Sequence, residues 1–438
     1  MTAEIAVLNK SAVALAADSA VTIQKPGGQK IFNTVNKLFM LSKHFPVGVM
    51  VFGRGDLQDV PWETIIKEYR YSYGGQGRDT LREYAEHLIG FLDSKNPFFP
   101  EARQEHFFTQ TTGTFFRYLR SQLDDWVRDQ TEEKGRTVTE SDIVGMLESV
   151  LESELAELMK KDALSHLPGN HGELVVKKYT KPLAEVRKRA FGKLPLSDKA
   201  EARLVEISQC LFQRDRFRGS ASGVVIAGFG EKEYFPSLHS YSVDGIVLDR
   251  LKYKLTTDGG ISYDRRAWIV PFAQAEMVHT FMRGVDPDIL SYVLRALNEM
   301  LVNKYPSHVL DLVPSLGAEE RQALDAKLKE TGKGILDELG KDVERYSWRE
   351  NVDPVITAVA SLPKDELALM AETLVNLTSF KRRVSMDAET VGGPIDVAVI
   401  SKGDGFIWIK RKHYFSTELN PCFNQNYFRK PEGQEDVQ

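Results

Sequence analysis

The chain has 438 residues, of which 42% are hydrophobic and 27% are charged, a composition typical of a globular protein with a large core. Its net charge of −5 shows no basic bias, so the composition does not suggest nucleic acid as a partner. Two cysteines are too few for a disulfide framework, and no apolar run reaches the roughly 20 residues of a membrane helix. We therefore expect a cytoplasmic protein that is not bound to a membrane.

The first 56 residues predict β-strands. Short apolar stretches separated by turns occupy residues 3–8, 12–17, 37–41 and 47–52, and they are expected to form two hairpins. Glu4, Lys10 and Asp18 interrupt the apolar N-terminal stretch, and no basic segment precedes it. We therefore expect no signal peptide and a mature chain that begins at or next to Met1.

The pattern then changes to helices as far as about Arg216. Helical spacing of apolar residues is found in residues 61–69, 80–92, 115–128 and 142–159. Thr139-Glu140-Ser141-Asp142 resembles a helix cap followed by acids in the first turn.

From Gly223 the strand pattern returns, with candidates at residues 224–227, 234–241, 246–255 and 268–272. Turns are expected at Gly228-Phe229-Gly230, Asp244-Gly245 and Asp258-Gly259-Gly260. Helices follow at roughly residues 273–283, 287–303, 318–339 and 364–376, and a last strand pair is expected at residues 395–400 and 406–410.

This order of strands, helices, strands, helices and strands predicts an α+β fold, specifically a four-layer αββα sandwich of two antiparallel sheets with extended helical insertions. We expect residues 1–56, 219–285 and 386–411 to form the core. Residues 57–218 would be a helical insertion that follows the first strand block, and residues 286–385 an enlarged helical layer. Residues 412–438 would be a C-terminal tail whose end is disordered.

The usual catalytic and cofactor motifs are missing from the sequence. There is no phosphate-binding loop and no His-Glu-x-x-His, and the nine histidines are scattered. Gly219-Ser220-Ala221-Ser222-Gly223 has alanine where a nucleophile elbow needs serine. We expect neither a metal nor another cofactor.

Thr2 is the first residue of chemical interest. Removal of the initiator methionine requires a small second residue, and it would leave Thr2 with a free α-amine beside its own hydroxyl. Such an amine can act as general base for the hydroxyl. Its pKa of roughly 7.7–8.0 suits it to accept and return a proton near neutral pH.

Three further residues make a set with Thr2. Asp18 ends a predicted strand sixteen residues later, and a hairpin of that length returns to the start of the first strand. Lys37 opens the next predicted strand. A buried strand then runs into Gly53, where a backbone N–H can meet a substrate carbonyl.

This set resembles the start of proteasome β subunits and of their bacterial relatives, the two-component heat-shock peptidase and the Anbu group. These are N-terminal nucleophile hydrolases. The resemblance implies that Thr2 is nucleophile and, through its amine, base. It implies that Asp18 orients Lys37, that Lys37 lowers the proton affinity of the Thr2 amine and hydroxyl, and that the Gly53 N–H stabilises the oxyanion. Lys30 is a rival for the role of Lys37, which we prefer because the strand after it keeps its alternation.

The second half of the site matches this family less well. Ala273–Glu276 falls where the family often has Gly-Ser-Gly, and Thr390–Gly393 falls where it often has Ser-Gly-Gly with an acid three residues earlier. The resemblance thus makes Gln274, Val391 and Asp387 the second-half candidates, with serine replaced twice and the acid displaced by one residue. Arg54 would make the substrate pocket narrower and cationic, which suggests tolerance for acidic groups.

Three hypotheses follow from these patterns. The first is an active threonine hydrolase acting on peptide or other amide bonds. The second is a catalytically silent, ring-forming scaffold or binding subunit of the same fold, motivated by Gln274 and Val391. The third is an unrelated α/β protein. The resemblance also implies a peptide or protein substrate and a homo-oligomeric ring or stack, and it leaves open an ATPase unfoldase as partner.

Overall fold

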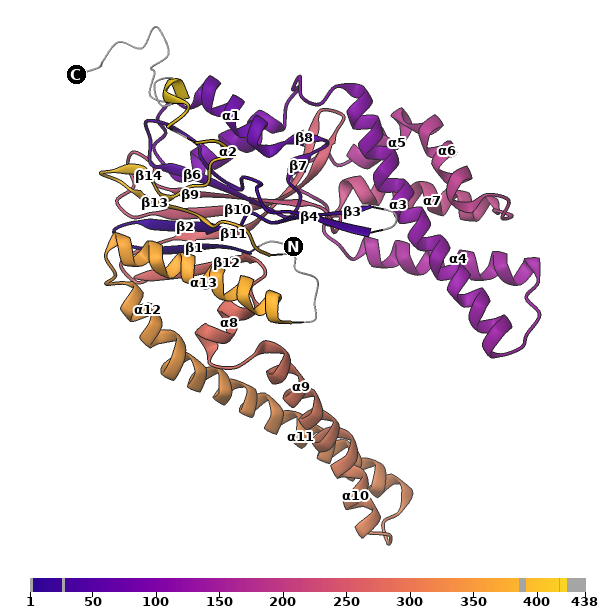
Figure 1. Ribbon diagram of the computed structural model, residues 1–438. Helices are drawn as coiled ribbons and strands as arrows, with labels where there is room; N and C mark the ends of the chain where they lie inside the picture. The colour runs from indigo at the N-terminus through magenta and orange to yellow at the C-terminus, as the bar shows by residue number, and fades with distance from the viewer. Residues whose placement is uncertain (1–2, 26–27, 386–390, 417, 424–438) are drawn as a thin grey trace. The chain divides into compact units, whose positions relative to one another are not determined.

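The computed structural model describes residues 3–25, 28–385, 391–416 and 418–423, and it shows a mixed α and β protein (Figure 1). The chain divides into two compact units. Unit 1 combines Met1–Leu38 with Ile261–Gln438, and unit 2 is Phe39–Gly260. This division cuts across the predicted core segments 1–56 and 219–285, because each of them contributes strands to both units.

Unit 1 contains an antiparallel sheet in which the described strands have the order β12-β1-β2-β13-β14. These strands are β1 (Ala3–Asn9), β2 (Val13–Ala17), β12 (Ala267–Ala273), β13 (Asp396–Ser401) and β14 (Gly405–Lys410). A separate ribbon pairs β3 (Val21–Lys25) with β4 (Gly28–Phe32). The β1–β2 hairpin and the β13–β14 pair confirm the strand predictions for both ends of the chain.

One face of this sheet is covered by helix α13 (Lys364–Val384). The odd-numbered side chains of β1, from Ala3 to Val7, pack with Leu367, Ala371 and Leu374 of the helix. Acidic residues in the first turn of α13 and basic residues in its last turn complement the helix dipole. Strand alternation places Glu4 on the opposite face of β1, and that position is also buried.

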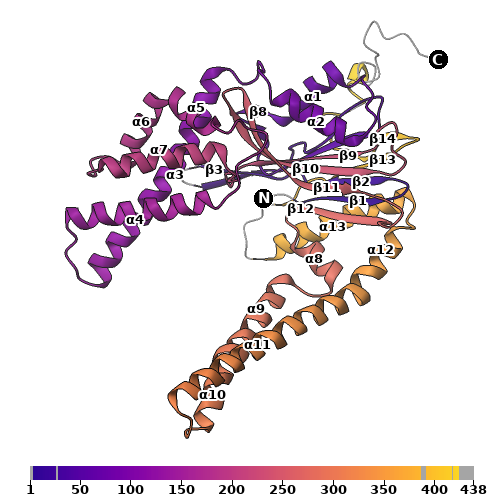
Figure 2. The same cartoon turned by 180° about the vertical axis from the view of Figure 1, so that it is seen from behind.

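The remaining helices of unit 1 form an arm in which α9 and α11 lie side by side (Figure 2). The helices are α8 (Glu276–Arg283), α9 (Pro287–Asn298), α10 (Tyr305–Leu312), α11 (Ala318–Ser347) and α12 (Asp353–Val359). The π-helical turn η2 (Glu299–Lys304) connects α9 to α10, and η3 (Trp348–Val352) connects α11 to α12.

Unit 2 contains a second antiparallel sheet, whose described strands have the order β11-β10-β9-β6-β5. They are β5 (Leu38–Met40, of which Leu38 is counted with unit 1), β6 (Val47–Phe52), β9 (Ser222–Gly228), β10 (Ser237–Val247) and β11 (Arg250–Gly260). A short hairpin pairs β7 (Asp56–Leu57) with β8 (Val60–Pro61).

Helices α1 (Trp62–Tyr73) and α2 (Leu81–Leu92) share a core with this second sheet. Another apolar cluster joins the remaining helices of unit 2. These are α3 (Glu101–Arg128), α4 (Glu140–Met159), α5 (His171–Lys178), α6 (Thr180–Phe191) and α7 (Asp198–Gln213), with π-helical turn η1 (Asp129–Glu133) after α3. The helices predicted at residues 61–69, 80–92, 115–128 and 142–159 are confirmed as α1, α2, α3 and α4.

The predicted turn at Asp244-Gly245 is wrong, and so is the continuous strand predicted over residues 246–255. Both residues lie inside β10, next to a register shift against β11. The chain turns instead at Leu248 and Asp249, which have φ values of 55° and 56°. Two non-glycine residues adopt this conformation because tertiary contacts hold them. Leu248 packs on the helical core, and Gln104 hydrogen-bonds both the backbone N–H and the carboxylate of Asp249.

The predicted turn at Asp258-Gly259-Gly260 is also wrong, since these residues are the last of β11. Among the described residues no helix is long and apolar enough to cross a membrane. The predicted disordered end, residues 433–438, lies outside the described residues. Cys210 and Cys422, both in the described part of the chain, are free thiols.

Helix α4 begins with the predicted cap. The Thr139 side chain accepts a hydrogen bond from the Asp142 N–H at 3.2 Å, and the Asp142 carboxylate accepts one from the Thr139 N–H at 3.0 Å. This reciprocal arrangement satisfies two backbone donors at the start of the helix.

We expect Thr139→Ala to lower the free energy of unfolding by about 1 kcal/mol, because it leaves the Asp142 N–H without its acceptor. Chemical denaturation followed by circular dichroism measures this. Thr137→Ala, two residues earlier and exposed, is the matched control and should change stability by less than about 0.5 kcal/mol. Equal effects of the two substitutions would contradict the assignment.

Candidate functional site

A buried ion pair joins Asp18 and Lys37 in unit 1. The Lys37 ammonium donates to Asp18 Oδ1 at 2.5 Å, and the two side chains are 4% and 0% exposed, respectively. Asp18 directly follows β2, and Lys37 directly precedes β5. The structure therefore brings together two of the residues that the sequence analysis selected.

Asp18 is held by the backbone as well as by Lys37. Its Oδ1 also accepts from the Ala3 N–H at 3.1 Å, and its Oδ2 accepts from the N–H groups of Ala20 at 3.2 Å and Gly392 at 3.1 Å. Four donors offset the cost of burying a charged carboxylate. This ties the pair to the start of β1 through Ala3 and to the segment before β13 through Gly392.

The backbone around Asp18 continues the same connections. The Asp18 N–H donates to the Ala3 carbonyl at 3.1 Å, and the Ser19 N–H donates to the Gly392 carbonyl at 3.1 Å. The Ser19 hydroxyl donates to the Pro394 carbonyl. Gly393 has a φ of 77°, and a side chain there would meet the Asn33 carbonyl, so glycine is required for this close approach.

Lys37, and not Lys30, is the cation beside Asp18. Lys30 lies on β4 with an exposed side chain, and its ammonium sits 4.9 Å from the centre of the Phe32 ring. Among the described residues the Lys37 ammonium makes one hydrogen bond, to Asp18. An ammonium carries three donors, of which the described residues accept from one.

Glu4 is a functional candidate that the sequence analysis missed. Its side chain is buried, with the residue only 2% exposed, and neither carboxyl oxygen has a hydrogen-bond partner among the described residues. Burial raises the pKa of Glu4 well above its ordinary value; Lys37 opposes this shift and Asp18 adds to it. Burial thus disfavours the charged form of Glu4, which lies near the Asp18–Lys37 pair. The signal in the sequence was a lone charge inside an apolar strand.

The second-half candidates provide no proton-transfer group in the described part of unit 1. The Gln274 side chain accepts a hydrogen bond from Arg382 Nε at 3.0 Å, and Arg382 also contacts Glu276 at 3.4 Å. Val391 is buried in the apolar cluster under α13. Asp387 lies outside the described residues, and so does Thr2.

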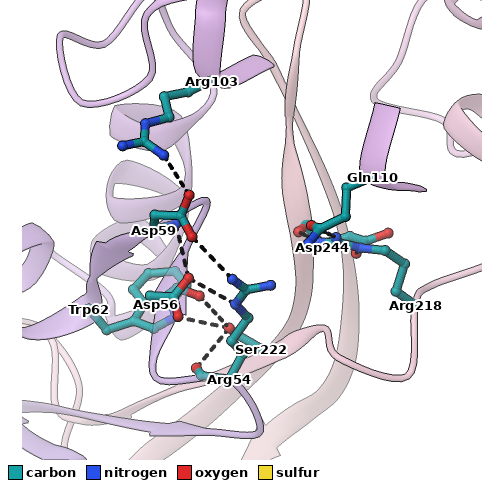
Figure 3. Close-up of polar contacts among 9 residues, drawn as sticks. All are labelled: Arg54, Asp56, Asp59, Trp62, Arg103, Gln110, Arg218, Ser222 and Asp244. Carbon is teal, nitrogen blue, oxygen red and sulfur yellow. Dashed lines mark hydrogen bonds and ion pairs between the residues drawn. The ribbon is translucent and has the colours of Figure 1, made fainter. Parts of the chain in front are cut away.

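Gly53 and Arg54 belong to unit 2. Gly53 directly follows β6 with a φ of 80°, and a side chain there would lie 2.6 Å from the Ala221 carbonyl oxygen, so only glycine fits. Arg54 donates to Asp56 at 2.8 Å and to Asp59 at 3.4 Å, as Figure 3 shows. An acidic substrate group would thus compete with two aspartates for Arg54.

The same region holds two more arginines. Arg103 donates to Asp59 at 2.6 Å, and Arg218 donates through Nε to the Asp244 carboxylate at 2.6 Å (Figure 3). Each arginine faces an aspartate, so the cluster is close to electrically balanced. Arg54 and Arg103 hold the aspartates of the β7–β8 hairpin, whereas Arg218 pairs with Asp244 of β10.

Among the described residues no group of three or more histidine, cysteine, aspartate or glutamate side chains is arranged to hold a metal ion. No known family model and no curated protein matches the sequence. The resemblance to N-terminal nucleophile hydrolases thus rests on the residues quoted for it.

We expect Lys37→Met to lower the free energy of unfolding by about 3 kcal/mol or more, because it leaves Asp18 buried without its counter-charge. Lys30→Met removes an exposed lysine from the same unit and should change stability by less than about 0.5 kcal/mol. Denaturant titrations at neutral pH compare the two variants. A small effect of Lys37→Met would show that backbone donors alone hold Asp18.

Glu4→Gln should change how stability depends on pH. Because the pKa of Glu4 is raised in the folded protein, the folded state keeps a proton that the unfolded chain loses. The free energy of unfolding therefore falls as pH rises from the unfolded pKa towards the folded pKa. The glutamine variant lacks this decrease. Its stability relative to wild type should rise with pH across that window, by at most about 1.4 kcal/mol for each pH unit.

Urea titrations between pH 4 and pH 8 measure this difference. Glu330→Gln, at an exposed position of α11, is the control and should follow the wild-type curve. Parallel curves for Glu4→Gln and wild type would mean that Glu4 is ionised in the folded protein.

Proposed function

We propose that this protein is a proteasome-like threonine hydrolase that cleaves peptide or other amide bonds, with Thr2 as its nucleophile after loss of Met1. The observation that carries the proposal is the buried Asp18–Lys37 pair and its hydrogen bond to the Ala3 N–H. That bond ties the Asp18 carboxylate, and through it the Lys37 ammonium, to Ala3, the residue that follows Thr2 in the chain. A buried cation there favours the neutral amine and the alkoxide that acyl transfer needs.

In the proposed mechanism Thr2 has two roles, as nucleophile through its hydroxyl and as general base through its α-amine. The Thr2 hydroxyl oxygen attacks the substrate carbonyl, and its proton passes to the Thr2 α-amine. The tetrahedral oxyanion is stabilised by a backbone N–H, for which Gly53 is the proposed donor. Collapse expels the amine half of the substrate, which takes the proton from the Thr2 ammonium. Water then hydrolyses the remaining ester and regenerates the hydroxyl.

Glu4 affects this scheme through its charge. A neutral Glu4 leaves the Lys37 charge opposed by Asp18 alone, whereas an ionised Glu4 would add a second negative charge beside it. The acid form therefore preserves the positive potential that the nucleophile requires.

The proposal includes the four-layer αββα sandwich and assembly into a ring or stack. The fold is supported by the two antiparallel sheets, one in each unit, and by the helix α13 that covers a face of the first. The mass of the native particle tests the assembly.

A silent subunit of the same fold is the second candidate. It is favoured by the second-half positions, where Gln274 is bound to Arg382 and Val391 is part of an apolar core. Neither side chain can donate or accept a proton in catalysis.

Thr2→Ala should abolish hydrolysis, with a loss of about 10³-fold or more, because it removes the nucleophile. The first measurement is the intact mass of the native-start protein before and after incubation with an epoxyketone or β-lactone probe. We expect loss of Met1 and one adduct, located on Thr2, and no adduct on the Thr2→Ala protein.

Thr137→Ala, which removes an exposed threonine hydroxyl elsewhere, should label like wild type. Turnover that survives Thr2→Ala would exclude the hydrolase mechanism. Retained Met1 in an assembled particle would instead support the silent subunit, since a blocked threonine has no free amine.

A further inference from the structure

Unit 1 contains an apolar pocket at the base of the helical arm, lined by residues of β12, α8, α9, α11 and η3. Its volume is about 430 Å³, which is within the range of about 300–1,000 Å³ typical of small-molecule sites. Its apolar walls include Ile269, Val278, Met282, Leu290, Leu294 and Val343. We call it the arm-base pocket.

Two glycines of α11 explain why the helices leave space here. At Gly332 an added Cβ would lie 2.6 Å from the Leu301 carbonyl oxygen, so the backbones of α11 and η2 are in close contact. Eight residues further along the helix, or about 12 Å, Gly340 lines the pocket, and its Cβ would meet no atom within 4 Å. Helix α11 therefore contacts η2 closely at Gly332, whereas space is left beside it at Gly340.

A third glycine lies between two residues that line the pocket, Arg283 and Val285. Helix α8 stops at Gly284, which has a φ of 73°, and the Asn351 side chain of η3 packs against it. The Ser347 hydroxyl donates to the Arg283 carbonyl at 2.8 Å and holds the end of α11 to the same turn. These contacts hold the C-terminal end of α8 against the end of α11 and against η3.

Three titratable side chains line the pocket: His279 and Arg283 of α8, and Glu344 of α11. The Arg283 guanidinium makes no hydrogen bond or ion pair among the described residues, and neither does the Glu344 carboxylate. Burial, and then the nearby Arg283 charge, lower the pKa of His279. The positive charge on α8 is therefore carried by Arg283, which keeps its fork of donors for an outside acceptor.

We propose that the arm-base pocket binds an amphipathic carboxylic acid, with its apolar body between the helices and its carboxylate on Arg283. The inference is independent of the proposed hydrolase activity. The size and apolar walls of the pocket select the body of such a ligand. The unpaired guanidinium selects the carboxylate, because a planar fork of donors matches its two oxygens. Glu344 also lines the pocket, and its negative charge opposes the binding of an anion. Removing that charge is therefore expected to strengthen carboxylate binding.

The test compares three probes of equal chain length on the purified full-length protein: decanoate, decanol and decylamine. Calorimetry measures their affinities, and fluorescence of Trp348, which lines the pocket, reports where they bind. We expect decanoate to bind most tightly and decylamine least. No decanoate binding, or equal affinity for all three probes, would overturn the proposal.

Two pairs of variants localise the binding. Gly340→Leu fills the pocket and should weaken decanoate by at least about tenfold, while Gly334→Leu, also unobstructed on α11 but outside the pocket lining, should not. Both substitutions favour the helix, so loss of folding is not expected. Equal binding by the two leucine variants would overturn the proposal.

The second pair tests the charges at the rim. Arg283→Gln should weaken decanoate about tenfold and leave decanol unchanged, whereas Glu344→Gln should strengthen decanoate. Opposite shifts from two substitutions that each remove one charge are not expected of non-specific hydrophobic binding. If Arg283→Gln has no effect on decanoate, the carboxylate is not bound there.

Discussion

The burial of the Asp18 carboxylate is the constraint on which the N-terminal part of unit 1 depends. An isolated carboxylate without exposure to water is unstable unless its oxygens are fully occupied. Here one oxygen takes Lys37 and the Ala3 N–H, and the other takes the N–H groups of Ala20 and Gly392. The segments that contain Ala3, Lys37 and Gly392 must therefore all reach the segment of Asp18 and Ala20. The need to satisfy one buried carboxylate sets their positions.

Glu4 is a second buried carboxyl, and its surroundings differ from those of Asp18. It is as deeply buried as Asp18, but its oxygens have no hydrogen-bond donors among the described residues, and burial raises its pKa well above the ordinary value. Two buried carboxyls in one neighbourhood thus differ in their hydrogen bonds: Asp18 accepts four, and Glu4 accepts none from the described residues. A carboxyl whose pKa is raised by burial is a recurring property of catalytic sites, and structural networks show it too.

The main errors of sequence interpretation concern glycine. Asp244-Gly245 has a strong turn composition, yet it lies within β10, where a side chain at Gly245 would meet the Phe107 ring. The glycine is needed for close packing of helix α3 on the strand and not for a turn. The true turn uses Leu248 and Asp249, whose composition does not predict a left-handed backbone, because Gln104 and the helical core hold it in place.

The sequence by itself determined the alternation of strand-rich and helix-rich blocks, the N-terminal hairpin and the cap of α4, because these depend on local periodicity and local hydrogen bonds. It also singled out Asp18 and two candidate lysines. Only the tertiary structure decided that Lys37 pairs with Asp18 and that Gly392 contributes a donor. It likewise showed that Glu4 is buried and unpartnered. Each of these depends on contacts between segments far apart in the chain, which no local pattern records.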